Sequence, residues 1–141
     1  MKLFQVRVVT RDVPELTKFY QEITGVEPSG GGDYAEFRTE GGGFAICSQK
    51  GIDSHSAGAA KPQANQSSIL DFQVADVDQE FARLKGKIGK LVLAPTDQPW
   101  GNRSMLFRDP DGNLINFFSP IQRPKDKDLD PGKDLKNKGQ G

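Results

Sequence analysis

The side chains that most often carry out chemistry in proteins are scarce in this chain of 141 residues. It has one histidine, His55, and one cysteine, Cys47. His55 lies in a stretch rich in Gly, Ala and Ser, where a single imidazole without neighbouring donors is typical of a solvated loop residue. Cys47 has no second cysteine to pair with, which excludes an intramolecular disulfide and favours a cytoplasmic protein over a secreted one.

Charged and amide side chains within strands are stronger candidates. Residues 3–9 alternate in polarity, which predicts a strand with Gln5 and Arg7 on one face. Asp71 occupies the same place as Arg7 in a second predicted strand, Ile69 to Val74, 64 residues further along. A guanidinium and a carboxylate at equivalent positions can form a structural ion pair or contact a ligand directly, and both interpretations stay open.

The elements that position these residues occur twice. Asp12 is a predicted N-cap with Glu15 three residues later, and Asp76 with Gln79 repeats the pattern at a shift of 64. A shift of 70 aligns Phe37-Arg38 with Phe107-Arg108. Recurrence of the same elements in the same order, at shifts of 64 and then 70, indicates two copies of one βαβββ unit, hence an α+β fold.

Composition sets the expected boundaries. The globular domain spans residues 1–121, with modules at about 1–50 and 67–121 joined by a Gly/Ala/Ser-rich linker, 51–66. Residues 122–141 form a charged tail with too few apolar side chains to compensate the entropy of ordering.

The last predicted hairpin resembles that of a known family. The segment Arg103 to Phe117, with its turn Asp109-Pro110-Asp111-Gly112, resembles the final hairpin of the vicinal oxygen chelate superfamily, which contains glyoxalases, bleomycin resistance proteins and extradiol dioxygenases. With Phe19-Tyr20 on the first helix, the two caps and the duplication, the resemblance covers residues 1–119. It implies that two modules form a curved mixed β-sheet cup with the helices on its outer face.

In that superfamily four side chains hold a metal ion in the cup. The resemblance places those positions at Gln5, Ile46, Ile69 and Asn116. Isoleucine offers no lone pair, and a neutral amide is a weak donor. We therefore expect no metal site and no other cofactor, and less than about 0.1 equivalent of nickel, zinc, iron or manganese in the purified protein.

Strand alternation from these positions defines the expected lining of the cup. The expected ligand-binding residues are Gln5, Arg7, Phe44, Ile46, Ser48, Ile69, Asp71, Gln73, Trp100, Asn116 and Phe118. Arg7 and Asp71 should approach within salt-bridge range on the cup floor, and Cys47 should point away from the cup. Trp100 is either a lid over the cup or a packing residue at the sheet edge.

The resulting hypothesis is a metal-independent protein that binds a small molecule, as drug-sequestering members of the superfamily do, and that forms a homodimer. A balance of 19 basic and 19 acidic residues argues against a nucleic-acid partner. The absence of a run of about 18 apolar residues argues against a membrane partner.

Two alternatives remain. One is a glyoxalase-, lyase- or dioxygenase-like enzyme with a displaced metal site, or with Glu36, Glu40 or Asp71 as a metal-free base. The other is a regulatory subunit whose tail contacts a partner.

Overall fold

Two four-stranded sheets and three helices make up the computed structural model, which describes residues 1–121, so the expected tail lies outside the described residues. The first module contains β1 (Gln5–Thr10), α1 (Val13–Thr24), β2 (Ser29–Gly31), β3 (Tyr34–Arg38), β4 (Gly43–Ser48) and α2 (Gln49–Ser56). The second contains β5 (Ile69–Gln73), α3 (Val77–Arg83), β6 (Lys90–Asp97), β7 (Asn102–Arg108) and β8 (Leu114–Pro120).

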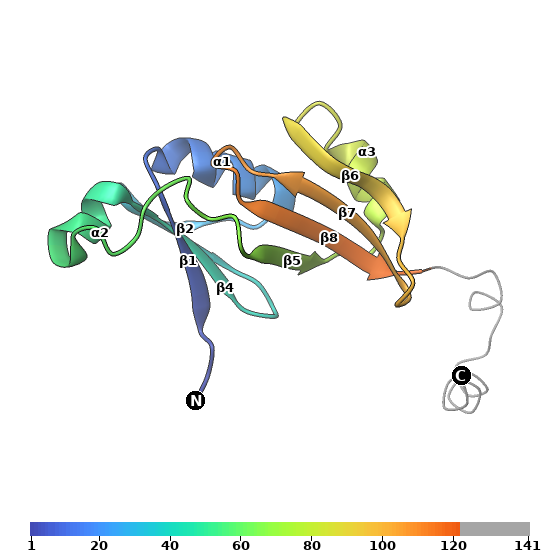
Figure 1. Ribbon diagram of the computed structural model, residues 1–141, viewed down its shortest axis with the longest axis horizontal. Helices are drawn as coiled ribbons and strands as arrows, with labels where there is room; N and C mark the ends of the chain where they lie inside the picture. Colours follow the sequence, from blue (N-terminus) through green and yellow to red (C-terminus); the bar gives the residue numbers. More distant parts are fainter. Residues whose placement is uncertain (122–141) are drawn as a thin grey trace.

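Both sheets have the same topology. Their strand orders are β1-β4-β3-β2, here sheet A, and β5-β8-β7-β6, here sheet B. In each sheet the first strand pairs parallel with the last, and the remaining pairs are antiparallel. The duplicated βαβββ unit and the α+β class are therefore confirmed (Figure 1).

The helices that occur in both copies of the repeat, α1 and α3, begin at the predicted caps. The Asp12 carboxylate accepts a hydrogen bond from the Glu15 amide at 3.0 Å, and Asp76 accepts one from the Gln79 amide at 3.1 Å. α1 ends at Gly25, whose φ of 69° is a left-handed conformation that glycine adopts without a steric penalty.

Helix α1 joins the two modules. Its Tyr20 ring lies 4.4 Å from the Phe44 ring of sheet A, and its Phe19 ring lies 6.4 Å from the Phe107 ring of sheet B, measured between centroids. Tyr20 also donates a hydrogen bond of 2.6 Å from its hydroxyl to Oδ2 of Asp109, in the turn of the last hairpin. Burial, followed by the nearby Asp109 carboxylate, raises the pKa of Tyr20 well above its ordinary value.

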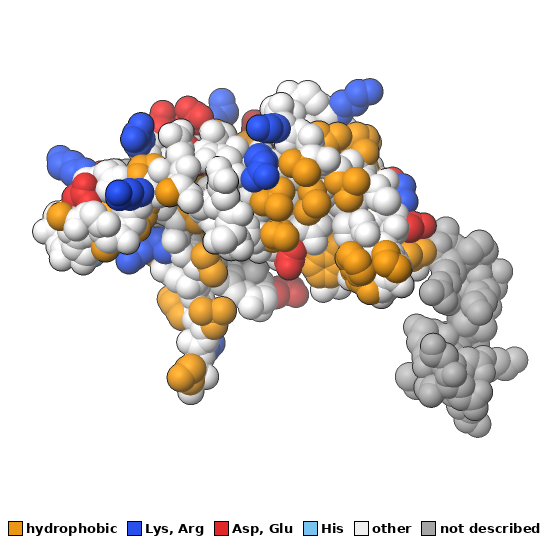
Figure 2. Space-filling model, viewed as in Figure 1, with side chains coloured by type: hydrophobic (Ala, Val, Ile, Leu, Met, Phe, Trp, Pro, Cys, Tyr) orange, Lys and Arg blue, Asp and Glu red, His pale blue; other side chains and the backbone are white. Residues whose placement is uncertain are grey.

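The start of the chain lies apart from this core. β1 carries the N-terminus away from the body of the molecule (Figure 1), and hydrophobic side chains cover this arm (Figure 2). Leu3 is 84 % exposed, Phe4 58 % and Val6 44 %. We refer to residues 1–6 as the N-terminal arm.

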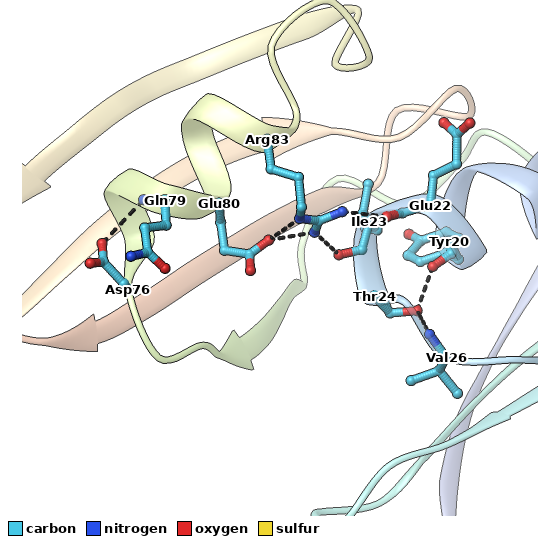
Figure 3. Close-up of polar contacts among 9 residues, drawn as sticks. All are labelled: Tyr20, Glu22, Ile23, Thr24, Val26, Asp76, Gln79, Glu80 and Arg83. Atoms are coloured by element: carbon cyan, nitrogen blue, oxygen red, sulfur yellow. Dashed lines mark hydrogen bonds and ion pairs between the residues drawn. The ribbon is translucent and has the colours of Figure 1, made fainter.

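A second polar link between the modules runs from α3 to α1. Arg83 donates hydrogen bonds of 2.8 Å to the carbonyl oxygens of Glu22 and of Ile23 in the last turn of α1 (Figure 3). Glu80 pairs with the same guanidinium and keeps it oriented. Arg83 thus caps carbonyl groups that have no partner within their own helix.

One helix lies where the sequence predicted a linker. α2 follows β4 directly, with the Ser48 hydroxyl accepting a hydrogen bond from the Gly51 amide at 2.8 Å and with Ile52 buried. Ile52 is its only apolar residue among small and polar ones, so the local cap and this one buried side chain define the helix. No helix among residues 1–121 is both long and apolar enough to cross a membrane.

Candidate functional site

The register of the strands determines which side chains face the concave side of each sheet. Residues directly opposite one another on paired strands point to the same face. In sheet A, Arg7 lies opposite Ala45, and in sheet B, Asp71 lies opposite Asn116. Ala45 is therefore the structural equivalent of Asn116, at a shift of 71.

This register corrects the expected orientation of β4. Phe44 and Ile46 point into the core and are 6 % and 0 % exposed, and Ser48 caps α2 instead of facing a cup. Cys47 shares the face of Gln5, not the opposite one, because it lies beside Val9. Burial raises the pKa of the Cys47 thiol, although the nearby Arg7 acts in the other direction.

The cause of the error is a single residue in a turn. The hairpin of sheet A pairs Arg38 with Gly43, whereas the hairpin of sheet B pairs Arg108 with Leu114, one position further along. The shift of 70 therefore holds on β3 and β7 but becomes 71 on β4 and β8. A slip of one residue turns every side chain of a strand to the other face.

With this register, the four positions that hold a metal in the superfamily correspond to Gln5, Ala45, Ile69 and Asn116. Two of these are aliphatic, and the other two are amides with partners of their own. Oε1 of Gln5 accepts a hydrogen bond of 2.7 Å from Arg38, and Nδ2 of Asn116 donates one of 2.9 Å to Asp71. Residues 1–121 contain no group of three or more His, Cys, Asp or Glu side chains placed to hold a metal. These donors do not fit a divalent metal centre.

The concave face of sheet B forms a pocket of about 390 Å³. Half of its lining is apolar and half is polar: Ile69, Leu93, Trp100, Leu106 and Phe118, with Asp71, Gln98, Asn102, Ser104 and Asn116. Figure 2 shows hydrophobic side chains gathered over the strands of this sheet. A pocket of this size, with apolar walls and a few polar groups, is typical of small-molecule sites.

A second depression, of about 410 Å³, lies beside α2. Arg11, Gln49, Asp53 and Lys61 contribute its polar lining, and its apolar contacts are alanines and one proline. Asp53 is occupied by hydrogen bonds from Gln49 and from the Gly58 amide. Large apolar side chains are absent from this lining, so we regard the sheet B pocket as the candidate site.

The expected ion pair on the cup floor does not form. The ion pairs within residues 1–121 join Arg38 to Glu36, Arg83 to Glu80, and Arg103 to Asp78 and Asp97. Arg7 and Asp71 lie on the outermost strands of two separate sheets, and no hydrogen bonds pair β1 with β5. Asp71 instead accepts the hydrogen bond from Asn116.

On sheet A the concave face carries a closed polar network. Gln5 donates a hydrogen bond of 3.2 Å to the Tyr34 hydroxyl, which donates one of 2.9 Å to Glu36. Arg38 binds both Glu36 and Gln5, and its guanidinium lies 3.8 Å above the Phe4 ring. Hydrogen bonds from Tyr34 and then Arg38 hold the pKa of Glu36 below its ordinary value.

The three remaining expected site residues, Trp100, Phe118 and Gln73, all belong to the second module. Trp100, at 69 % exposure, and Phe118 line the sheet B pocket, whereas Gln73 shares that face through its pairing with Phe118 but lies outside the lining. Sequence analysis missed Leu93, Gln98, Asn102, Ser104 and Leu106 of the pocket, and Tyr34 and Arg38 of sheet A. Strand alternation along residues 102–108 could have placed Asn102, Ser104 and Leu106 on the pocket face, and alternation along residues 34–38 could have placed Tyr34 and Arg38 on the concave face of sheet A.

Comparisons with known proteins agree with this architecture. Residues 2–117 match the family described as the Glyoxalase/Bleomycin resistance protein/Dioxygenase superfamily. The protein YraH of Bacillus subtilis (strain 168) is 30 % identical over 128 residues, which cover 86 % of this chain and 100 % of YraH.

Solved structures give the same result for the fold. A protein of unknown function from Agrobacterium tumefaciens str. C58 is 25 % identical, with a TM-score of 0.74 over 86 % of this chain and 95 % of its own. A glyoxalase/bleomycin resistance protein/dioxygenase family enzyme from Burkholderia phytofirmans PsJN is 16 % identical, with a TM-score of 0.77 over 86 % of this chain and 100 % of its own.

Proposed function

Because the chain belongs to the glyoxalase/bleomycin resistance protein/dioxygenase superfamily, we propose that it is a metal-independent protein that binds a small organic molecule. The observation that carries this proposal is the pocket of about 390 Å³ on sheet B, which combines five apolar side chains with five polar ones. Sequestration of a drug-like compound in the cytoplasm is the role that suits such a protein.

Metal independence rests on the donors at the four equivalent positions. Ala45 and Ile69 have no ligand atoms, and both amides are already hydrogen-bonded. Elemental analysis of protein purified without a chelating tag should find less than about 0.1 equivalent of transition metal. One full equivalent that disappears in Gln5→Ala would contradict this part of the proposal.

Ligand binding can be tested with the single tryptophan as a reporter. Trp100 lines the pocket, so a ligand that enters should change its fluorescence. Leu106→Arg places a long charged side chain in the pocket, and we expect it to abolish binding of any compound found in a screen. Leu91→Arg, at an exposed residue outside the lining, is the matched control and should bind normally. Equal binding by both variants would exclude this pocket as the site.

The proposal includes a homodimer. Within residues 1–121, β1 pairs only with β4 and β5 only with β8, so both sheets end in a free strand edge. Free edges next to exposed apolar side chains, such as Phe4, Val6 and Ile69, are surfaces that proteins usually cover. A second copy packed against the N-terminal arm and β5 would cover them and deepen the pocket. Sedimentation at several concentrations should give twice the chain mass, and a monomer throughout would contradict it.

The enzymatic alternative receives less support. A general base works best with a pKa near the working pH, whereas the pKa of Glu36 is lowered and its carboxylate is engaged by Tyr34 and Arg38. Glu40 is exposed in the β3–β4 turn, and Asp71 lies beside an amide, without a second titratable group in the pocket lining.

A further inference from the structure

The charge of the sheet B pocket is set by one residue. Asp71 is the only charged side chain among the ten that line it. Arg103, on neighbouring β7, is occupied by Asp78 and Asp97. Among the residues that the structure describes, no cation forms an ion pair with Asp71. Within residues 1–121, the pocket therefore offers a negative charge without a counter-ion.

The neighbouring amide adds a second acceptor. A carboxylate can only accept hydrogen bonds, so the Asn116 amide must turn its nitrogen toward Asp71, which it contacts at 2.9 Å. The other atom of the amide, Oδ1, is buried and has no hydrogen-bond partner within residues 1–121. A buried acceptor without a partner is unfavourable, and a ligand N–H would satisfy it.

The walls around these acceptors are aromatic and aliphatic. Trp100 presents most of its surface to the outside, and Phe118 lies next to Asp71 in the sheet through its pairing with Gln73. Aromatic rings attract cations through their faces, and they also stack on flat ligands. The aromatic walls and the two acceptors therefore both favour a flat cation with an N–H donor.

We infer that this pocket selects flat aromatic cations that carry an N–H donor, and that Asp71, oriented by Asn116, is the residue that determines this selectivity. This inference rests on the proposed binding function and adds the ligand class to it. An anion of the same shape should be disfavoured, because it would meet the Asp71 carboxylate and the Asn116 oxygen, and the ten lining residues include no cation to compensate.

Three acridines of the same shape provide the test. At neutral pH, 9-aminoacridine is a cation with N–H donors, acridine is neutral, and acridine-9-carboxylate is an anion. We expect calorimetric affinities to fall in that order, with the cation ahead of neutral acridine by roughly fivefold. Added salt should reduce this advantage, since part of the lining is open to solvent.

Two variants assign the effect. Asp71→Asn should reduce the affinity for 9-aminoacridine to that for acridine and leave acridine unchanged. Asp33→Asn, which removes an equal charge from an exposed turn of sheet A, should leave the cation preference intact. Loss of preference in both variants would overturn the assignment to Asp71.

The failure of the inference can be told apart from the failure of the proposed function. Equal binding of acridine and 9-aminoacridine, both lost in Leu106→Arg, would overturn the ligand class and leave the binding function in place. No binding of 9-aminoacridine would also overturn the inference. The binding function itself fails only if a broad panel of compounds shows no binding that Leu106→Arg abolishes.

Discussion

Sheets A and B share a topology but treat the polar groups on their concave faces in opposite ways. On sheet A, Gln5, Tyr34, Glu36 and Arg38 hydrogen-bond to one another in a closed network. On sheet B, Asp71 and Asn116 form one contact, and the Asn116 oxygen has no partner among the described residues. The four network residues of the first face satisfy one another, whereas the second face keeps an acceptor without a partner within residues 1–121.

This difference shows that the two copies of the unit share their backbone arrangement but not the chemical character of the side chains on it. Equivalent positions carry Arg7 and Asp71 on the first strands, and Ala45 and Asn116 on the last. Opposite charges at matching places make one face unsuitable for the ligands that the other face favours. Function on a shared fold follows the side chains of the site.

The largest difference in stability is expected between alanine variants of Ile46 and Ile69, the two isoleucines that sequence analysis placed at metal positions. Ile46→Ala empties a fully buried core site and should lower the free energy of unfolding by about 3 kcal/mol. Ile69→Ala, at a residue 52 % exposed, should lower it by less than about 1 kcal/mol. Urea denaturation of both variants measures the contrast. Similar losses would mean that β4 does not have the register described here.

The link between α1 and the last hairpin should give the next largest effect. Tyr20→Phe removes the hydrogen bond to Asp109 and should cost about 1–2 kcal/mol, because the acceptor is charged and buried. The raised pKa of Tyr20 adds a pH signature: its stabilising contribution is complete below the unfolded value of about 10 and is lost as pH rises above it. Thermal unfolding between pH 7 and 11 should therefore show a steeper alkaline loss for the wild type than for Tyr20→Phe, and parallel curves would refute this role.

Much of the fold could be predicted from the sequence because its signals are local. The Asp12 and Asp76 caps, the strand periodicity and the turn at Asp109 each depend on residues within a few positions of one another. Repetition of these signals at a nearly constant spacing then indicated the duplicated unit.

The concave face of sheet A could not be predicted in the same way. The orientation of Phe44 and Ile46 depends on one residue in the turn before β4, and a shift taken from β3 does not reveal that difference. The missing Arg7–Asp71 contact depends on how two sheet edges lie in space, which alternation within a strand does not define. Helix α2 has a single apolar residue, Ile52, which is too few to form a recognisable apolar stripe.

A smaller effect on stability is expected at the clamp, as we call the contact of Arg83 of α3 with the last carbonyl groups of α1. Arg83→Ala removes two hydrogen bonds to carbonyl oxygens at the end of α1 and should cost about 1 kcal/mol, since the side chain is partly exposed. Arg83→Lys keeps the charge near the helix end and should recover part of this loss. Lys18→Ala, on the exposed surface of α1, is the control and should unfold like the wild type. If the two Arg83 variants match that control, the clamp does not stabilise the fold.

The smallest expected effect concerns Glu36, and it tests whether the sheet A network is closed to ligands. Glu36→Gln should leave the affinity for 9-aminoacridine unchanged within about twofold, whereas Asp71→Asn should lower it. The Glu36→Gln substitution should instead change the stability of the protein at acidic pH. Because the hydrogen bonds from Tyr34 and Arg38 lower the pKa of Glu36 below 4.5, its contribution is present above that value and is lost as pH falls through the lowered pKa. Acid unfolding of the wild type should therefore include a loss that Glu36→Gln lacks. A change in ligand affinity in Glu36→Gln as large as that in Asp71→Asn would show that both faces contribute to one site, as they could in a dimer.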